Sequence, residues 1–166
     1  MKKTLQKINE LMDLGIIKKY AIAGGMAQFY YIEPSVTYDL DLLVNIAEEE
    51  NTLNPFAKIY EWAQSNGYPP LEEHIVIYGI PVQFLLAYND LVKEALDKSE
   101  EIVLFDEKTY ILKPEYLMAI LLQTDRLSDK ERFAKFLSEV DYDNNSFLEI
   151  IERFNLSGVY KRISGV

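Results

Sequence analysis

The feature that most restricts how this chain can fold is a pair of glycines, Gly24 and Gly25, set between two apolar runs. Residues 20–23 are apolar and stop at the pair, which predicts a buried strand that leads into a tight turn. Residues 26–31 predict a short helix, and residues 38–46 alternate between apolar and polar side chains as a strand does. A strand, a glycine turn, a helix and a second strand in this order indicate an α/β arrangement.

The rest of the chain adds helices before this unit, and strands and helices after it. Apolar periodicity and turn residues predict helices over residues 4–14, 55–65, 89–98, 114–124, 127–140 and 146–154, and strands over residues 75–78, 82–86, 102–105 and 109–112. The predicted class is α/β (α+β), with a small mixed β-sheet flanked by helices and a C-terminal helical tail. We expect residues 1–112 to form the α/β core and residues 113–166 to form a helical portion of the same domain.

Composition limits the environment and the partners of the protein. The chain has 166 residues, a net charge of −10 and no cysteine, so disulfides and thiolate metal sites are excluded. No apolar run approaches the roughly 18 residues that cross a bilayer, and the N-terminus lacks the core of a signal peptide. We therefore expect a cytoplasmic protein without a membrane partner. An acidic balance also argues against an extensive nucleic-acid surface, because such surfaces are basic.

The glycine pair and two aspartates are the residues best suited to chemistry. Gly24 and Gly25 would let the backbone approach a ligand closely, and the following helix would offer its first amide groups to a phosphate. Asp39 and Asp41 are two residues apart on a predicted strand, so their carboxylates share one face at a spacing of about 7 Å along the backbone. Such a pair can hold a hard cation such as Mg²⁺, which keeps other positions for water and phosphate oxygens.

The aspartate pair also has a plainer interpretation. Asp-x-Asp occurs a second time in the chain, at Asp141 and Asp143, where it precedes a predicted helix. A carboxylate pair on a strand can simply be a solvated face. The functional interpretation depends on the combination of Asp39 and Asp41 with the strand, glycine pair and helix that come before them.

With these motifs in place, the sequence resembles a known family. Gly24-Gly25, followed by the Thr-Tyr-Asp-Leu-Asp-Leu of residues 37–42, is similar to the signature of the polymerase-β-type nucleotidyltransferase superfamily. The closest branch is the abortive-infection toxin-like nucleotidyltransferases of bacteria and archaea. Residues 80–85 and 113–119 resemble later segments of that branch.

The resemblance implies a fold, a reaction and a set of residues. In the family, Mg²⁺ ions bridge carboxylates and a nucleoside triphosphate, and a nucleotidyl group passes to an acceptor. By match, Asp39 and Asp41 would be the catalytic metal ligands. The positions expected to contact the nucleotide are Gly24, Gly25, Thr37, Tyr38 and Gln83. The branch also implies a toxin of a toxin–antitoxin pair, with a cognate antitoxin protein as partner.

The chain departs from the family pattern at four positions. The third carboxylate is expected at Gln83, whose amide is neutral. Basic residues are usual at the positions of Ser35, Leu121 and Ser128. These changes leave three alternatives open: an enzyme with a single metal ion or with Glu72 or Glu73 as the replacement acid, a catalytically inactive relative that binds nucleotide or protein, and an interaction domain without a nucleotide. The only histidine, His74, is expected to have a surface role.

Overall fold

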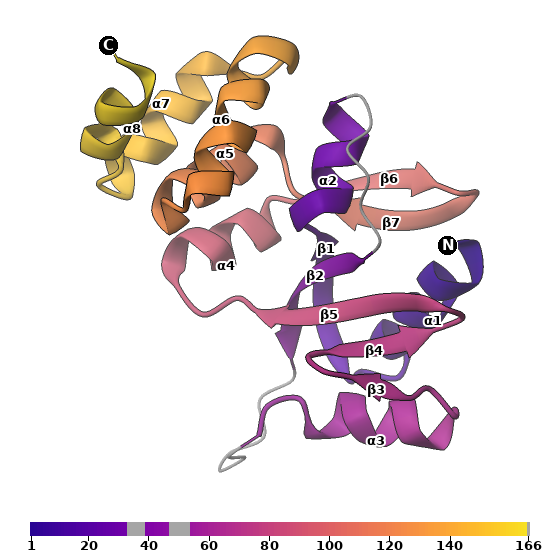
Figure 1. Ribbon diagram of the computed structural model, residues 1–166. Helices are drawn as coiled ribbons and strands as arrows, with labels where there is room; N and C mark the ends of the chain where they lie inside the picture. Colours follow the sequence, from indigo (N-terminus) through magenta and orange to yellow (C-terminus); the bar gives the residue numbers. More distant parts are fainter. Residues whose placement is uncertain (33–38, 47–53, 166) are drawn as a thin grey trace.

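The computed structural model describes residues 1–32, 39–46 and 54–165, which form eight helices and seven strands (Figure 1). The helices are α1 (Lys2–Asp13), α2 (Gly24–Tyr31), α3 (Ala57–Ser65), α4 (Asp90–Asp97), α5 (Pro114–Thr124), α6 (Leu127–Glu139), α7 (Asn144–Arg153) and α8 (Ser157–Ser164). The strands are β1 (Ile17–Ile22), β2 (Leu40–Ile46), β3 (Pro70–Leu71), β4 (His74–Ile77), β5 (Ile80–Leu86), β6 (Glu100–Leu104) and β7 (Glu107–Ile111).

All seven strands belong to one mixed sheet in the order β3-β4-β5-β2-β1-β7-β6. The central pair, β1 and β2, is antiparallel, whereas β5 runs parallel to β2 and β7 runs parallel to β1. The outer pairs β4–β5 and β6–β7 are antiparallel hairpins. Each parallel pairing needs a long crossover, and the sheet is therefore covered by helices. The predicted fold class, a mixed sheet flanked by helices with a helical tail, is confirmed.

Helices cover both faces of this sheet. Tyr20 of β1 points toward α1, where its hydroxyl donates to Asn9 Oδ1 at 2.7 Å. Lys19 points the other way by strand alternation, and its Nζ donates to the carbonyl of Asp97 at the end of α4 at 2.8 Å. Lys19 is the register partner of Asn45 in β2, so Asp41, four residues earlier, lies on the α4 side of the sheet.

The C-terminal helices pack against the same side of the molecule as α2 and α4 (Figure 1). The rings of Tyr31 at the end of α2 and Phe136 of α6 lie 6.4 Å apart between centroids. Phe133 of α6 and Phe147 of α7 are fully buried and contact each other. The tail therefore fixes α6 beside α2, which positions both helices near the candidate site. The expectation that residues 113–166 belong to the same domain as the core stays a prediction.

Two elements are absent from the sequence-based prediction. Strand β3 has only two residues, Pro70 and Leu71, and α8 carries no fully buried side chain, so neither leaves a strong periodic pattern. The helix predicted over residues 55–65 begins two residues later, at Ala57, and Asn54 Oδ1 accepts from the amide of Phe56 just before it. Among the described helices, none combines the length and the apolar character that crossing a membrane requires.

Candidate active site

Gly24 and Asp41 are in direct contact at the centre of the sheet. The amide of Ala23 donates to the carbonyl of Asp41 at 2.9 Å, which holds the end of β1 against β2. Gly24 then turns into α2 with φ of +54°, a conformation that favours glycine. A Cβ atom at this position would lie 1.8 Å from Asp41 Oδ2, which is far inside a van der Waals contact. Only glycine leaves room for this carboxylate.

The first turn of α2 presents amide groups to the same carboxylate. The backbone N–H of Gly25 donates a hydrogen bond to Asp41. Ala23 precedes the helix and makes no side-chain hydrogen bond to it. The Ala23 side chain therefore leaves the first amides of α2 uncapped. A helix N-terminus carries partial positive charge and is well suited to anions such as a carboxylate or a phosphate. The structure thus brings together Gly24, Gly25 and Asp41.

The charge state of Asp41 is under opposing influences. Burial is the largest influence and raises the pKa of the Asp41 carboxyl above its ordinary value, and the carboxylate of Asp39 acts in the same direction. His74, the Gly25 amide and Arg132 lower the pKa of Asp41, but they do not outweigh burial. A carboxylate with an unfavourable negative charge gains from a cation placed beside it, which is the usual electrostatic setting of a metal ligand.

Gln83 and His74 extend the site across two more strands. Asp41 of β2 is the register partner of Gln83 of β5, and Gln83 is in turn the register partner of His74 of β4. Register partners on adjacent strands point to the same face and lie about 4.8 Å apart between strands. The three side chains therefore form a row over β2, β5 and β4. Gln83 Nε2 also donates to Glu73 Oε2 at 3.1 Å.

His74 belongs to the site, and the expectation of a surface role is not met. Its side chain is only 19% exposed, and its Nε2 lies 3.9 Å from Asp39 Oδ2. The same Nε2 is buried without a hydrogen-bond partner among the described residues. The sequence signal for this placement is Gly79 between two apolar runs, which predicts a tight turn. The residues Tyr78 and Gly79 both have positive φ and form the two-residue turn of the β4–β5 hairpin, and that turn pairs His74 with Gln83.

Arg132 supplies a cation from the C-terminal helices. Its charge acts on Asp41 although the two residues are far apart in the sequence. Arg132 lies on α6 one turn before Phe136, whose ring is 6.4 Å from that of Tyr31 at the C-terminal end of α2. Arg132 Nη1 lies 3.8 Å from Oδ1 of Asp129, a buried residue whose other carboxylate oxygen accepts from the Thr124 hydroxyl at 2.7 Å. Spacing alone did not reveal this residue.

The donor set is compatible with a hard divalent cation. Within the described ranges, no three histidine or acidic side chains converge closely enough to hold a metal ion by themselves. Asp39 and Asp41 provide carboxylate oxygens, Gln83 carries an amide oxygen, and the unpartnered Nε2 of His74 is a further polar atom at the edge of the site. Mg²⁺ accepts few protein ligands because it retains water and binds substrate phosphates. Two of the predicted nucleotide-contacting residues, Thr37 and Tyr38, and also Ser35, lie outside the described residues.

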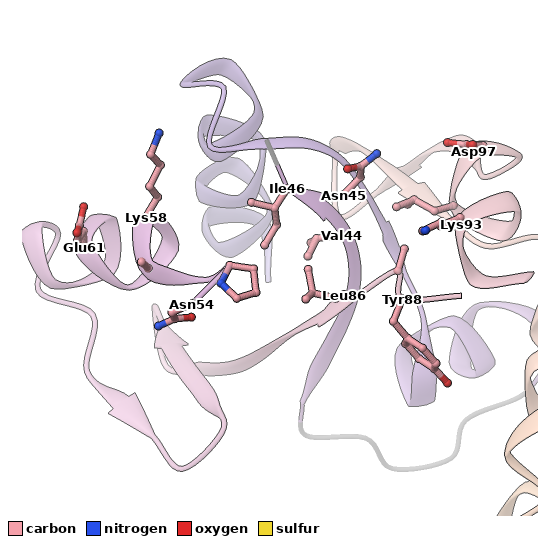
Figure 2. A pocket seen from close by; sticks show the side chains of 14 residues that line it. Val44, Asn45, Ile46, Asn54, Lys58, Glu61, Leu86, Tyr88, Lys93 and Asp97 are labelled. Atoms are coloured by element: carbon pink, nitrogen blue, oxygen red, sulfur yellow. The ribbon is translucent and has the colours of Figure 1, made fainter. Parts of the chain in front are cut away.

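A separate cavity of about 610 Å³ lies at the other end of β2 (Figure 2). Its walls include Asn45 of β2, Tyr88 after β5, Lys58 of α3 and Lys93 of α4. Its volume falls in the range of small-molecule sites. None of the predicted site residues lines it, however, so the candidate site is built on the carboxylates and not on this cavity.

The arrangement of sheet and helices is that of a nucleotidyltransferase-like fold. The chain is similar to the crystal structure of an antigenic nucleotidyltransferase-like protein from Paracoccidioides brasiliensis, with a TM-score of 0.57 over 95% of this chain and 90% of that one. The two sequences are 14% identical, so the likeness concerns the fold. No protein-family model and no curated protein sequence matches the chain. Membership of the abortive-infection toxin-like branch stays a prediction.

Proposed function

We propose that the protein binds a complex of a divalent cation and a nucleoside triphosphate at Asp41 and transfers a nucleotidyl group to an acceptor. The observation that carries the proposal is the contact between Gly24 and Asp41 at the start of α2. This contact puts a carboxylate that can bind a cation beside the amides of a helix N-terminus. A complex of a cation and a triphosphate needs both features, because the carboxylate binds the cation and the helix amides donate hydrogen bonds to phosphate oxygens.

The reaction is a displacement at the α-phosphorus of the triphosphate. An acceptor oxygen would form a bond to this phosphorus, the bond from phosphorus to the bridging oxygen would break, and pyrophosphate would leave. The acceptor proton would pass to water. A cation held by Asp39 and Asp41 would neutralise charge on the phosphates, and the Arg132 guanidinium would add a second positive group from α6. The role of the protein is thus to position the reactants and to offset negative charge.

Calorimetry is the first test of binding. We would titrate the purified protein with ATP, CTP, GTP and UTP, each with and without Mg²⁺, beside the Asp41→Asn variant. The proposal expects Mg²⁺-dependent binding of at least one nucleotide and its loss in the variant. If the folded protein binds none of the four, the proposed function is wrong and an interaction domain without a nucleotide remains.

A second candidate is a nucleotide-binding module that does not transfer. Gln83 favours it, because a neutral amide at this position leaves one fewer negative charge to hold cations. Labelled nucleotides separate the two candidates. A transferase incorporates label from the α-phosphate into a protein or RNA acceptor but not label from the γ-phosphate. A binding module shows Mg²⁺-dependent affinity and incorporates neither label.

The sequence resemblance supports extending the proposal to a toxin that is neutralised by a cognate antitoxin protein. In that case, induced expression of the chain in bacterial cells arrests growth, and the Asp41→Asn variant at equal abundance does not. Growth that is unaffected by the active protein would remove the toxin role and leave the proposed chemistry untouched.

A further inference from the structure

The amide of Gln83 has a defined orientation. Its Nε2 donates to Glu73 Oε2 at 3.1 Å. A carboxylate only accepts hydrogen bonds, whereas a side-chain amide donates through nitrogen and accepts through oxygen. Glu73 therefore determines that the nitrogen end of the amide faces it. The amide oxygen, Oε1, must be turned away from Glu73.

The strand order determines which residue the amide oxygen of Gln83 faces. Strand β5 lies between β4 and β2. Glu73 immediately precedes β4, so it approaches Gln83 from one side, and Asp41 is the register partner of Gln83 on the other side. Because the nitrogen faces the β4 side, the amide oxygen Oε1 faces the opposite side, where Asp41 lies.

We infer that Gln83 Oε1 is a third oxygen ligand of one divalent cation held together with Asp39 and Asp41, and that Glu73 is the positioning residue that keeps this oxygen turned toward the cation. The inference rests on the proposed function, since it concerns the same site. Amide oxygens are ordinary ligands of hard cations. A neutral third ligand completes the set of protein ligands when only two carboxylates are at hand. Among the described residues, no group of three histidine or acidic side chains converges to hold a metal ion.

The ligand set has a consequence for the number of metal ions. Two carboxylates and an amide carry two negative charges at the cation, whereas three carboxylates would carry three. Two cations placed close together repel each other and need the larger negative charge between them. The set formed by Asp39, Asp41 and Gln83 is therefore suited to one cation, with its remaining positions left for water and phosphate oxygens.

The test uses Mn²⁺ alone, followed by electron paramagnetic resonance of the free ion during titration of the full chain. Gln83→Leu keeps the size of the side chain and removes its oxygen, and we expect Mn²⁺ affinity to fall by about tenfold or more. In Glu73→Asn the new side chain is too short to reach the Gln83 amide, and we expect Mn²⁺ affinity to fall by about tenfold. Glu72→Asn is the matched control: it removes the same charge from the same turn, suits the positive φ of Glu72, and should leave the affinity unchanged.

A charge swap removes the ambiguity of a variant that folds poorly. Combining Glu73→Gln with Gln83→Glu conserves net charge and lets the new amide donate to the new carboxylate. We expect this protein to bind Mn²⁺ more tightly than the original chain. Mn²⁺ binding can depend on Asp41 and yet not be weakened by Gln83→Leu, or not be strengthened by the swap. Either result overturns the inference and leaves the proposed function standing. Mn²⁺ binding that is absent, or indifferent to Asp41→Asn, overturns both.

Discussion

At the scale of single residues, the candidate site depends on how closely Gly24 approaches Asp41. The backbone turn at Gly24 and the carboxylate occupy neighbouring volumes that no Cβ atom can share. This contact sets the position of Asp41 relative to the amides of α2. It also means that a small change at the glycine acts directly on the Asp41 carboxylate.

Gly24→Ala is expected to abolish Mg²⁺-dependent nucleotide binding, because the new methyl group displaces Asp41. The matched control is Gly15→Ala. Gly15 has a similar φ of +69°, but nothing lies within 4 Å of the added Cβ. The control carries only the left-handed backbone cost of about 1–2 kcal/mol. Calorimetry and thermal unfolding measure both effects, and equal behaviour of the two variants would show that the contact with Asp41 has no role in binding.

Arg132→Gln is expected to weaken nucleoside triphosphate binding by about tenfold or more, since hydrogen bonds to charged groups contribute about 1.5–3 kcal/mol. Arg126→Gln removes the same side chain from the start of the same helix and is expected to change affinity little. Both are compared by calorimetry in the presence of Mg²⁺. Equal losses in the two variants would indicate a general effect of charge and exclude a phosphate contact by Arg132.

At the scale of elements, the site is assembled where the ends of secondary structures meet. The start of α2 reaches β2, the β4–β5 hairpin brings Gln83 and His74 to Asp41, and the charge of Arg132 on α6 lowers the pKa of Asp41. The tail is tied to the core through α4. Glu94 of α4 accepts from Arg153 of α7 at 2.9 Å and from the hydroxyl of Tyr116 of α5 at 2.6 Å.

Glu94→Gln is expected to destabilise the protein by about 1 kcal/mol at neutral pH, as for a partly exposed ion pair. Arg153 is the main reason that the pKa of Glu94 is lowered from 4.5 to about 2. A lowered folded-state pKa means stability that is present above the unfolded value and lost as pH falls toward 2. The difference in melting temperature between the original protein and the variant should therefore shrink between pH 4.5 and pH 2. Glu152→Gln, which removes an exposed carboxylate of α7, should show no such convergence.

Most elements could be predicted from the sequence, since strong apolar periodicity and turn residues mark them. Helix α5 begins and ends as predicted, at Pro114 and Thr124. The strand and turn around the glycine pair and the strand that carries Asp41 could be predicted because these signals are local, and the roles of Gly24, Gly25 and Asp41 stay predictions. The place of His74 beside Gln83 follows from the local β4–β5 hairpin, but its place near Asp41 depends on the pairing of β5 with β2, which is not local. The influence of Arg132 on Asp41 depends on packing between residues far apart in the chain. The roles of Asp39 and Gln83, and those of Thr37 and Tyr38, stay predictions.

At the scale of the whole molecule, net charge separates the candidate acceptors. The chain carries a net charge of −10, and Arg132 is a basic residue whose charge acts on Asp41. A nucleotide enters such a site together with its own divalent cation, whereas a long polyanion must meet the acidic surface around it.

The isolated protein is accordingly expected to bind single-stranded RNA no more tightly than about 100 µM at physiological salt. Fluorescence anisotropy with a labelled oligonucleotide measures this directly. Tight binding that weakens steeply with added salt would show that basic residues gather on a surface in spite of the net charge. It would also make an RNA end the favoured acceptor.

The hydrogen bond between Gln83 and Glu73 has an evolutionary consequence. Glutamine and glutamate codons differ by one base, and either residue at either of these two positions can keep an amide–carboxylate pair. A lineage carrying this scaffold can thus exchange a charged side chain for a neutral one at the position of Gln83 in two single-base steps without rebuilding the sheet. Gly24 allows no comparable exchange, because every other residue brings a Cβ into Asp41. Relatives with this site should therefore vary at the position of Gln83 and remain constant at the glycine.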